Sequence, residues 1–234
     1  MMAQLLAQQN TLRPLHSYSK SSACSHQSFL AAANQEKAIQ KCIEEHITPV
    51  INKELCELLE QHSSKAVPFR VLGVGSGEGE NDIHLLEAFS KIRRKPNTAI
   101  SVVNRVVEPD VARLSTFRAK ATNLSKRFMK EVNVAFEWVP MTFQEYCSHK
   151  KAEDVKFDVV HFIHSIYYLG VEDALVHCYK KELGDRGIII SITQAEDDPM
   201  MKFASQFPDQ RHRSFPRNKD VVAVAKQKGW KYFA

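Results

Sequence analysis

Apolar residues in this chain fall into two patterns, short continuous runs and longer stretches with helical spacing. Five runs have the length and β-branched content of buried parallel strands. They are Phe69–Val74, Ile100–Val107, Val132–Val139, the first half of Phe157–Leu169, and Ile188–Ile192. The helically spaced stretches are Gln35 to about His62, 81–93, Val111–Lys130, 171–182 and Lys219–Lys228. Strands that alternate with helices predict an α/β fold, a sheet with helices on both faces.

The two ends of the chain differ from this regular middle part. Residues 1–34 are polar and are separated here as an N-terminal segment, and 35–234 are taken as one domain. The helices predicted before the first strand could cap a cofactor cleft or could only cover one side of the sheet. Residues 184–187 predict a turn, and Gly229–Ala234 predicts the beginning of another strand.

Glycine occupies every second position from Gly73 to Gly79, between the first predicted strand and the following helix. Four of the chain's eight glycines lie there, which indicates a sharp turn or the close approach of a ligand. A strand, a glycine-rich turn and a helix are typical of the nucleotide-binding corner of a doubly wound sheet. The alternative is an ordinary glycine-rich connection.

The spacing of these glycines does not fit a dinucleotide fingerprint. G-x-G-x-x-G would require a third glycine at Glu78 or Glu80, and two acids would repel a pyrophosphate. The pattern G-x-G-x-G is instead similar to the glycine motif of class I S-adenosylmethionine-dependent methyltransferases. Their cofactor carries a sulfonium cation and no phosphate, so nearby carboxylates are acceptable.

A second informative position is Glu108, which follows the strand Ile100–Val107 and precedes Pro109. An acid at the carboxyl end of the second strand can accept hydrogen bonds from both ribose hydroxyls of an adenosyl group. The alternative is a surface glutamate without a ligand. The glycine loop before it favours ribose binding.

Composition restricts the class of protein. The chain has 234 residues, 44% hydrophobic and 25% charged, and a net charge of +5, as expected of a globular domain. The basic cluster of Lys91, Arg93, Arg94 and Lys95 is interpreted as a solvated helix end, and no nucleic-acid partner is predicted.

Cysteine usage and hydropathy bear on metal, membrane and compartment. The five cysteines are scattered with no C-x-x-C pair, which favours reduced thiols and predicts neither a disulfide frame nor a metal site. No apolar run reaches the about twenty residues of a membrane span. The acid-free first 35 residues are similar to a mitochondrial transit peptide, but arginine is sparse. A cytoplasmic location is expected.

Several segments together resemble the histamine N-methyltransferase family, including its carnosine-methylating relatives. They are Val71–Glu80, Val106–Pro109, Phe157–Tyr168 and Ser205–Pro208. The resemblance extends from about Phe29 to the last residue, and it implies a Rossmann-like class I methyltransferase sheet. The family continues past this chain's end, so the C-terminal strands of the sheet are expected to be incomplete. The chain is expected to be a fragment or an isoform of low stability and little activity.

The resemblance also implies cofactor-binding residues for S-adenosyl-L-methionine. Gly75 and Glu108 fall on the family's cofactor-binding glycine and glutamate, and Gly77 and Gly79 complete the loop. Ile163 falls on an adenine-side contact. Arg113 stands where the family has a cofactor-binding glutamine.

On the substrate side the chain departs more from the family. Gln35, beside Glu36, stands where the family has the glutamate that holds the amine of histamine. His164 replaces a glutamine that contacts the imidazole, and Tyr168 is a further candidate for substrate binding. Two tryptophans of the family's pocket are replaced by Glu196 and Met200.

The function implied is methyl transfer to an imidazole or amine nitrogen of a small molecule that is histamine-like or carnosine-like. His164 and Tyr167 are the candidate catalytic residues, which orient the nucleophile or receive its proton. For His164 the alternative is a histidine satisfied by local hydrogen bonds. A catalytically weak or inactive cofactor-fold protein with a binding or regulatory role is the alternative function. The oligomeric state is left open, with a monomer expected for a full-length protein.

Overall fold

The computed structural model describes six stretches of the chain, 35–58, 67–91, 100–128, 132–149, 155–193 and 218–233. The chain divides into two compact units, Met1–Ala38 and Ile39–Ala234. The second unit contains the sheet and the glycine loop. The first contributes only the beginning of helix α2 (Gln35–Cys42) to the described residues.

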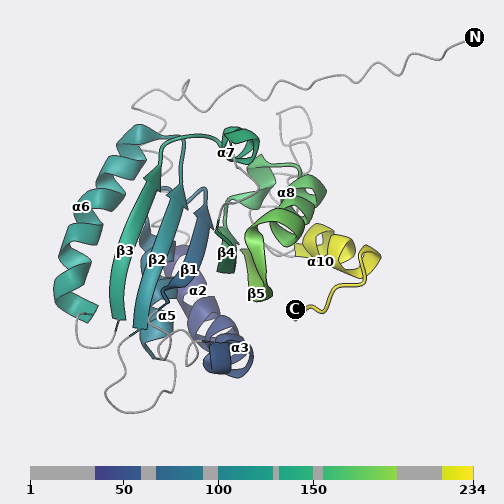
Figure 1. Cartoon of the computed structure of the whole chain (residues 1–234), viewed down its shortest axis with the longest axis horizontal. Helices are drawn as coiled ribbons and strands as arrows, with labels where there is room; N and C mark the ends of the chain where they lie inside the picture. The colour runs from purple at the N-terminus through teal and green to yellow at the C-terminus, as the bar shows by residue number, and fades with distance from the viewer. Residues whose placement is uncertain are drawn as a thin grey trace, which may run out of the picture. The chain divides into compact units, whose positions relative to one another are not determined.

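Five parallel strands form the sheet, in the order β3-β2-β1-β4-β5 (Figure 1). Their bounds are β1 Phe69–Val74, β2 Ile100–Val107, β3 Val132–Val139, β4 Phe157–Ile163 and β5 Leu183–Ile192. The strand order reverses direction between β1 and β4. In open α/β sheets ligands bind at the carboxyl ends of the strands beside such a reversal. The predicted α/β fold is confirmed.

Helices cover both faces of this sheet. One face carries α3 (Thr48–Glu54), α5 (Glu80–Ser90) and α6 (Val111–Phe128), with a π-helical turn at Ile43–Ile47 before α3. The other face carries α7 (Phe143–His149), α8 (Val171–His177), a π-helical turn at Cys178–Glu182, and α10 (Asn218–Gln227). Alternate strand residues therefore enter two separate cores.

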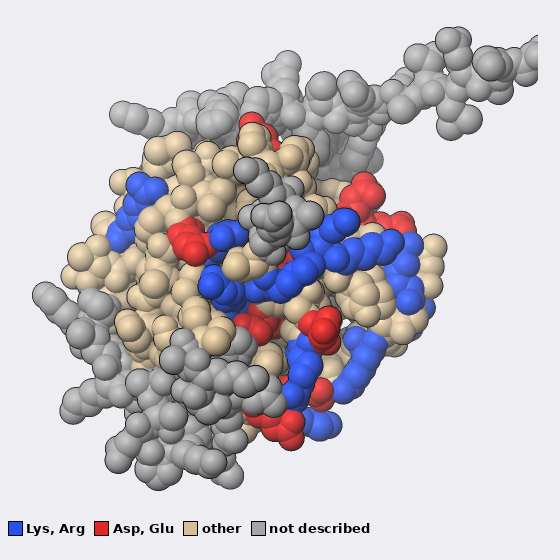
Figure 2. Space-filling view, viewed as in Figure 1, with Lys and Arg blue, Asp and Glu red and all other residues tan. Residues whose placement is uncertain are grey.

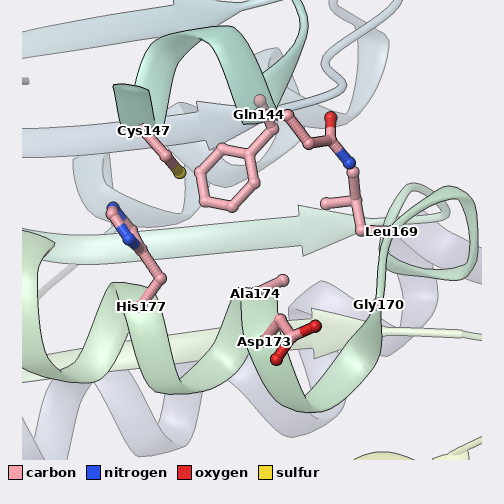
Figure 3. A pocket seen from close by; sticks show the side chains of 8 residues that line it. Gln144, Cys147, Leu169, Gly170, Asp173, Ala174 and His177 are labelled. Atoms are coloured by element: carbon pink, nitrogen blue, oxygen red, sulfur yellow. The ribbon is translucent and has the colours of Figure 1, made fainter. Parts of the chain in front are cut away.

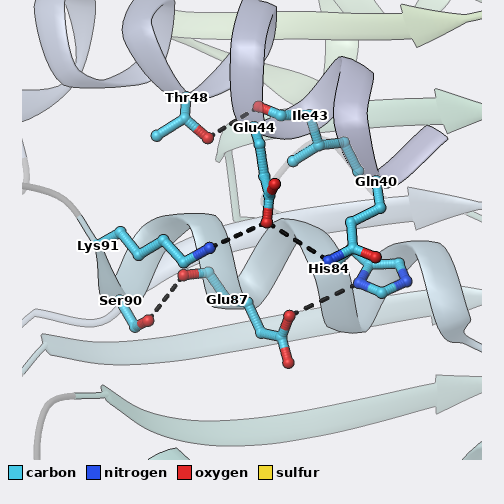
Figure 4. Close-up of polar contacts among 8 residues, drawn as sticks. All are labelled: Gln40, Ile43, Glu44, Thr48, His84, Glu87, Ser90 and Lys91. Carbon is cyan, nitrogen blue, oxygen red and sulfur yellow. Dashed lines mark hydrogen bonds and ion pairs between the residues drawn. The ribbon is translucent and has the colours of Figure 1, made fainter. Parts of the chain in front are cut away.

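The helices before β1 cover one side of the sheet, which is the simpler of the two predicted roles. Ile43, Ile51 and Leu55 are buried in the same core as Phe69 of β1 and Phe89 of α5. Figure 4 shows polar contacts within this layer and within α5, and one that joins the layer to the end of α5. In that contact the Glu44 carboxylate lies 3.2 Å from the Lys91 ammonium, so one member of the predicted basic cluster is ion-paired.

Strand β5 begins earlier than predicted. The predicted turn at 184–187 lies within the bounds of β5, where the pairing shifts from Phe157 opposite Leu183 to Val159 opposite Ile188. Asp185 and Arg186 are exposed there. The turn residues thus interrupt the register of an edge strand, as a bulge does.

The strand predicted at the end of the chain is wrong for its described residues, because 230–233 have no strand structure. Gly229, with φ 67°, ends α10, and the Trp230 amide donates to the Ala225 carbonyl at 2.9 Å. This is the hydrogen bond of a helix C-terminal cap. The Trp230 ring then stacks on Tyr179, with ring centroids 4.3 Å apart, so packing against a helix decides the conformation of these aromatic residues.

The surface shows charges of both signs. On the face seen in Figure 2, Lys and Arg gather near the centre of the molecule with Asp and Glu interspersed among them. None of the helices in the described stretches is long and apolar enough to cross a membrane. The same stretches contain no group of three or more His, Cys, Asp or Glu residues arranged to hold a metal ion.

Candidate functional site

The glycine loop, residues 73–79, joins β1 to α5 at the carboxyl edge of the sheet. Gly75, Gly77 and Gly79 have φ values of 68°, 59° and 86°, in the left-handed region that favours glycine. A Cβ atom on Gly79 would lie 2.1 Å from the Phe117 ring of α6. The loop therefore needs glycine both for its backbone conformation and for its contact with α6.

Neighbouring strands hold the first part of this loop. The Gly75 amide donates to the Val107 carbonyl of β2 at 2.8 Å. A Cβ atom on Gly75 would lie 2.6 Å from the Cβ atom of Ser165, which follows β4. The Ser165 hydroxyl donates to the Val74 carbonyl at 2.5 Å. The loop thus sits between the ends of β2 and β4, at the reversal of strand order.

Gly77 differs from the other loop glycines in having open space beside it. Among the described residues, a Cβ atom there would have one neighbour within 4 Å, a guanidinium nitrogen of Arg113 at 3.9 Å. A backbone that is left-handed and uncovered allows a ligand to approach closely.

Glu108 follows β2 and faces the glycine loop. Its side chain is 6% exposed. One carboxylate oxygen accepts from the Gly77 amide at 2.8 Å, and the other accepts from the Asp110 amide at 2.9 Å. Burial raises the pKa of Glu108, and the hydrogen bonds from Asp110 and Gly77 act in the opposite direction. Each oxygen keeps acceptor capacity for a further donor.

Two further residues predicted to contact the cofactor lie in different surroundings. The Arg113 side chain is 49% exposed and lies 3.8 Å from the Asp110 carboxylate, beside Gly77. Ile163 is 5% exposed, and its side chain packs in the core on the face of α5. Only a small part of Ile163 is therefore accessible to a ligand.

Two acids beside the open end of the loop, Glu78 within it and Glu80 at the start of α5, are paired with a cation. The Lys120 ammonium of α6 contacts the carboxylate of Glu80 and lies 3.5 Å from that of Glu78. These side chains are about one third exposed. One ammonium faces two carboxylates, so the pairing offsets about half of the negative charge that the sequence placed beside the ligand position.

His164 begins the segment that follows β4. Its φ is 53°, the only positive value at a non-glycine residue among the described residues, and its amide donates to the Ile192 carbonyl of β5 at 2.9 Å. A side chain in the left-handed region costs about 1–2 kcal/mol. Such conformations are concentrated at functional sites.

The predicted tyrosines come directly after His164. The rings of His164 and Tyr167 are perpendicular, with centroids 6.3 Å apart, and those of Tyr167 and Tyr168 lie 4.5 Å apart. Burial raises the pKa of Tyr167, while the positive charge of Arg113 acts in the opposite direction. Tyr168 is 48% exposed.

The remaining predicted substrate residues belong to the first compact unit or lie outside the described residues. Gln35 and Glu36 start α2 in the first compact unit, and Glu36 is exposed. Their substrate roles stay predictions. Glu196 and Met200 lie outside the described residues.

Sequence reasoning missed several polar residues around the loop. Asp82 on α5, Asn104 in β2 and His161 in β4 are each at most 1% exposed and meet beneath Gly73. Asn104 and His161 interrupt apolar strand runs, a pattern that could have identified them. The contacts of Ser165 and Lys120 had no signal in the sequence.

A separate pocket of about 300 Å³ lies between α7 and α8 (Figure 3). Its lining is mainly apolar and includes Phe143, Leu169 and Ala174, with Gln144, Asp173 and His177 as polar members. The His177 ring is held by the buried Glu182 carboxylate at 3.1 Å. None of the predicted cofactor or substrate residues lines this pocket.

The arrangement at the sheet edge can hold a polar ligand that offers hydroxyl donors to Glu108 and lies against the open backbone of Gly77. The Glu108 carboxyl with its raised pKa, His164 with its positive φ and the half-buried Tyr167 lie at the reversal of strand order, a combination typical of active sites.

Comparison with known proteins adds the following findings. A family model described as "Methyltransferase domain" matches residues 28–234. Histamine N-methyltransferase of Cavia porcellus is 25% identical over 191 residues, which is 78% of this chain and 62% of that protein. Carnosine N-methyltransferase 2 of Gallus gallus is 24% identical over 168 residues, 69% of this chain and 50% of that protein.

Among solved structures, a SAM dependent methyltransferase from Archaeoglobus fulgidus matches with a TM-score of 0.42 and 17% identity, over 79% of this chain and 69% of that chain. This likeness is too low to carry an argument. The chain spans less than two thirds of the length of the two curated relatives.

Proposed function

The chain belongs to the methyltransferase domain family, and on that premise we propose that it transfers a methyl group from S-adenosyl-L-methionine to a nitrogen of a small molecule. S-adenosyl-L-methionine is the cofactor of the family matched here. The observation that carries the proposal is the hydrogen bond from Gly77 of the glycine loop to the buried Glu108 carboxylate. This hydrogen bond joins a glycine backbone that a ligand can approach closely to a carboxylate that can accept from the ribose hydroxyls of an adenosyl group.

The residues present fit this cofactor. Both oxygens of Glu108 retain acceptor capacity for ribose hydroxyls, and Gly77 has open space on its left-handed backbone. Glu78 and Glu80 share an ion pair with Lys120, and the negative charge that remains is compatible with a sulfonium cation. We assign ribose binding to Glu108, backbone contacts to Gly75, Gly77 and Gly79, and a polar contact to Arg113. Ile163 stays a candidate for the adenine side.

The cofactor supplies a methyl group already activated on a sulfonium. The residues of the chain then have to align the acceptor nitrogen and exclude water, which contributes much of the rate in such a displacement. Because burial raises the pKa of Tyr167, its phenol stays protonated at neutral pH and acts as a hydrogen-bond donor. His164 is therefore the group to which we assign receipt of a proton from the acceptor.

The acceptor we propose is an imidazole or amine of a small molecule. The two curated relatives carry the names histamine N-methyltransferase and carnosine N-methyltransferase 2. Gln35, in place of the family's pocket glutamate, provides no charge for a cationic amine. We therefore propose that an imidazole with a zwitterionic or neutral tail, such as carnosine, is preferred over histamine. Gln35→Glu should shift preference toward histamine.

The test is formation of adenosylhomocysteine and methylated product with a panel of imidazoles and amines, each measured by kcat/KM. Glu108→Ala provides the cofactor-deficient control, and Glu182→Gln provides a buried carboxylate variant remote from the loop. Product with one class of acceptor, lost in Glu108→Ala only, supports the proposal. Cofactor binding without product from any acceptor would indicate a binding protein instead. Histamine as the preferred acceptor would refute the substrate assignment.

A further inference from the structure

A cluster of four polar side chains lies beneath the glycine loop. The Ser76 hydroxyl and the Asn104 amide each donate to Oδ1 of Asp82 at 3.1 Å. His161 Nε2 lies 3.2 Å from the same oxygen, close enough for an ion pair when the imidazole is protonated. The four residues come from the loop, α5, β2 and β4. One carboxylate oxygen thus connects the loop to the strands on both sides of β1.

The backbone of Gly73 lies directly against this cluster. A Cβ atom on Gly73 would be 2.5 Å from Oδ1 of Asp82, 2.6 Å from the Ser76 hydroxyl and 2.8 Å from His161 Nε2. All three distances are shorter than van der Waals contact. Gly73 is the one glycine of the motif without a left-handed φ, and its close contacts with the cluster are the reason that it must be glycine.

Two carboxylates hold consecutive residues of the loop. Ser76 donates its hydroxyl to Asp82, and Gly77 donates its amide to Glu108. Glu108 is itself at the proposed ribose position, whereas Asp82 is 1% exposed and on the core side of the loop. Displacement of Ser76 would therefore move the Gly77 amide relative to Glu108.

The cluster is poorly satisfied for a buried group. Within the described part of the chain, Oδ2 of Asp82, Oδ1 of Asn104 and both ring nitrogens of His161 are buried and have no hydrogen-bond partner, so Nε2 of His161 meets Asp82 as a close contact and not as a hydrogen bond. Buried polar groups without partners reduce stability, and well-packed apolar residues often replace buried ion pairs without loss. Stability alone therefore does not account for this set of residues.

We propose that Asp82 and His161 are positioning residues for the cofactor. They fix Ser76 and, through it, the Gly77 amide that the Glu108 carboxylate accepts, without touching the cofactor themselves. His161 packs against Asp82 from the β4 side, with Nε2 3.2 Å from Oδ1. This inference rests on the proposed function, because it assigns a role at the same cofactor site.

The first test compares two variants of Asp82 by calorimetric titration with adenosylhomocysteine. Asp82→Asn keeps an oxygen that can accept from Ser76 and Asn104, so affinity should stay within about threefold of wild type. Asp82→Ala removes the acceptor, and affinity should fall about tenfold or more. The KM for S-adenosylmethionine should rise in parallel, while kcat at saturation changes less than about twofold. Equal affinity of wild type and Asp82→Ala would overturn the proposal.

A second test does not depend on the folding of Asp82→Ala. Ser76→Ala removes only the loop's own bond to Asp82 and leaves the core side chains in place. Amide hydrogen exchange of the ligand-free protein should then be faster at Gly77 than in wild type. Unchanged exchange at Gly77 would show that the cluster does not position the loop.

Variants of His161, with Tyr146→Phe as a control far from the loop, provide a third test. His161→Leu should weaken adenosylhomocysteine binding, and His161→Gln, which keeps a donor, should restore most of it. Tyr146→Phe removes a buried hydroxyl that donates to Glu182 on the other face of the sheet, so it should lower the melting temperature with unchanged affinity. Affinity that simply follows the melting temperature across all variants would refute positioning. If wild type itself does not bind adenosylhomocysteine, the proposed function fails first.

Discussion

Replacement of Glu108 by alanine is the most direct perturbation of the proposed cofactor site. In the ligand-free protein the change removes the acceptor of two backbone amides, those of Gly77 and Asp110. In the complex it also removes the acceptor of the ribose hydroxyls. Because the Glu108 side chain is only 6% exposed, water reaches the vacated position poorly and replaces these hydrogen bonds only in part.

The magnitude follows from the two hydrogen bonds that a ribose would donate to this carboxylate. Charge-assisted hydrogen bonds of this kind contribute roughly 2–4 kcal/mol together, which corresponds to about a 30-fold to 700-fold loss of affinity. Glu108→Gln should be intermediate, because its NH2 group must face either the Gly77 amide or the Asp110 amide, donor against donor. Isothermal titration with adenosylhomocysteine measures both variants, with Glu182→Gln as the control. Affinity within twofold of wild type in Glu108→Ala would refute ribose binding by this residue.

The pH dependence provides an independent check on Glu108. Ribose hydroxyls donate to the carboxylate form, so affinity should be constant near neutral pH and fall as pH drops through the raised pKa of Glu108. The midpoint of this fall in affinity should lie above the ordinary glutamate pKa of about 4.3.

The free energy of unfolding should change with pH in the direction opposite to that expected of a salt-bridged acid. The stability contributed by Glu108 is present below the ordinary value and is lost as pH rises through its raised pKa. Both dependences should disappear in Glu108→Ala, and their persistence there would assign them to another group.

Three further predictions concern the loop and the segment after β4. Gly79→Ala should lower the free energy of unfolding by about 3 kcal/mol, because a Cβ atom would lie 2.1 Å from an aromatic ring of α6. Gly77→Ala should cost only about 1 kcal/mol, since the space there is open; equal losses in urea denaturation would contradict this reading. Glycine usually lowers stability by about 0.4–1 kcal/mol relative to alanine. Because φ is 53° at His164, His164→Gly should be at least as stable as His164→Ala on thermal unfolding. A glycine variant less stable than the alanine variant by the usual amount would indicate that His164 is not strained. Ser165→Ala should cost about 1 kcal/mol in urea denaturation by removing the hydroxyl's 2.5 Å bond to a β1 carbonyl, and no loss would show that this bond contributes nothing.

The sequence determined the sheet and the position of the glycine loop. Local signals were sufficient there, because buried parallel strands read as continuous apolar runs. The bounds of β1, β2 and β3 agree with the predicted ranges Phe69–Val74, Ile100–Val107 and Val132–Val139. The glycines at alternate positions were expected to permit close approaches. Positive φ values at Gly75, Gly77 and Gly79 are consistent with that expectation.

Tertiary structure decided the features that depend on residues far apart in the chain. The aromatic residues at 230–233 have the composition of a strand, but a helix cap and a ring stack on Tyr179 give them another conformation. Glu78 and Glu80 are charges in the sequence, and only the fold brings Lys120 to them. Asp82 and His161 are 79 positions apart in the sequence, yet Oδ1 of Asp82 lies 3.2 Å from Nε2 of His161, beside Gly73. Propensity and periodicity report on neighbours along the chain, whereas the contacts that shape this site form only when α5, β2 and β4 pack around β1.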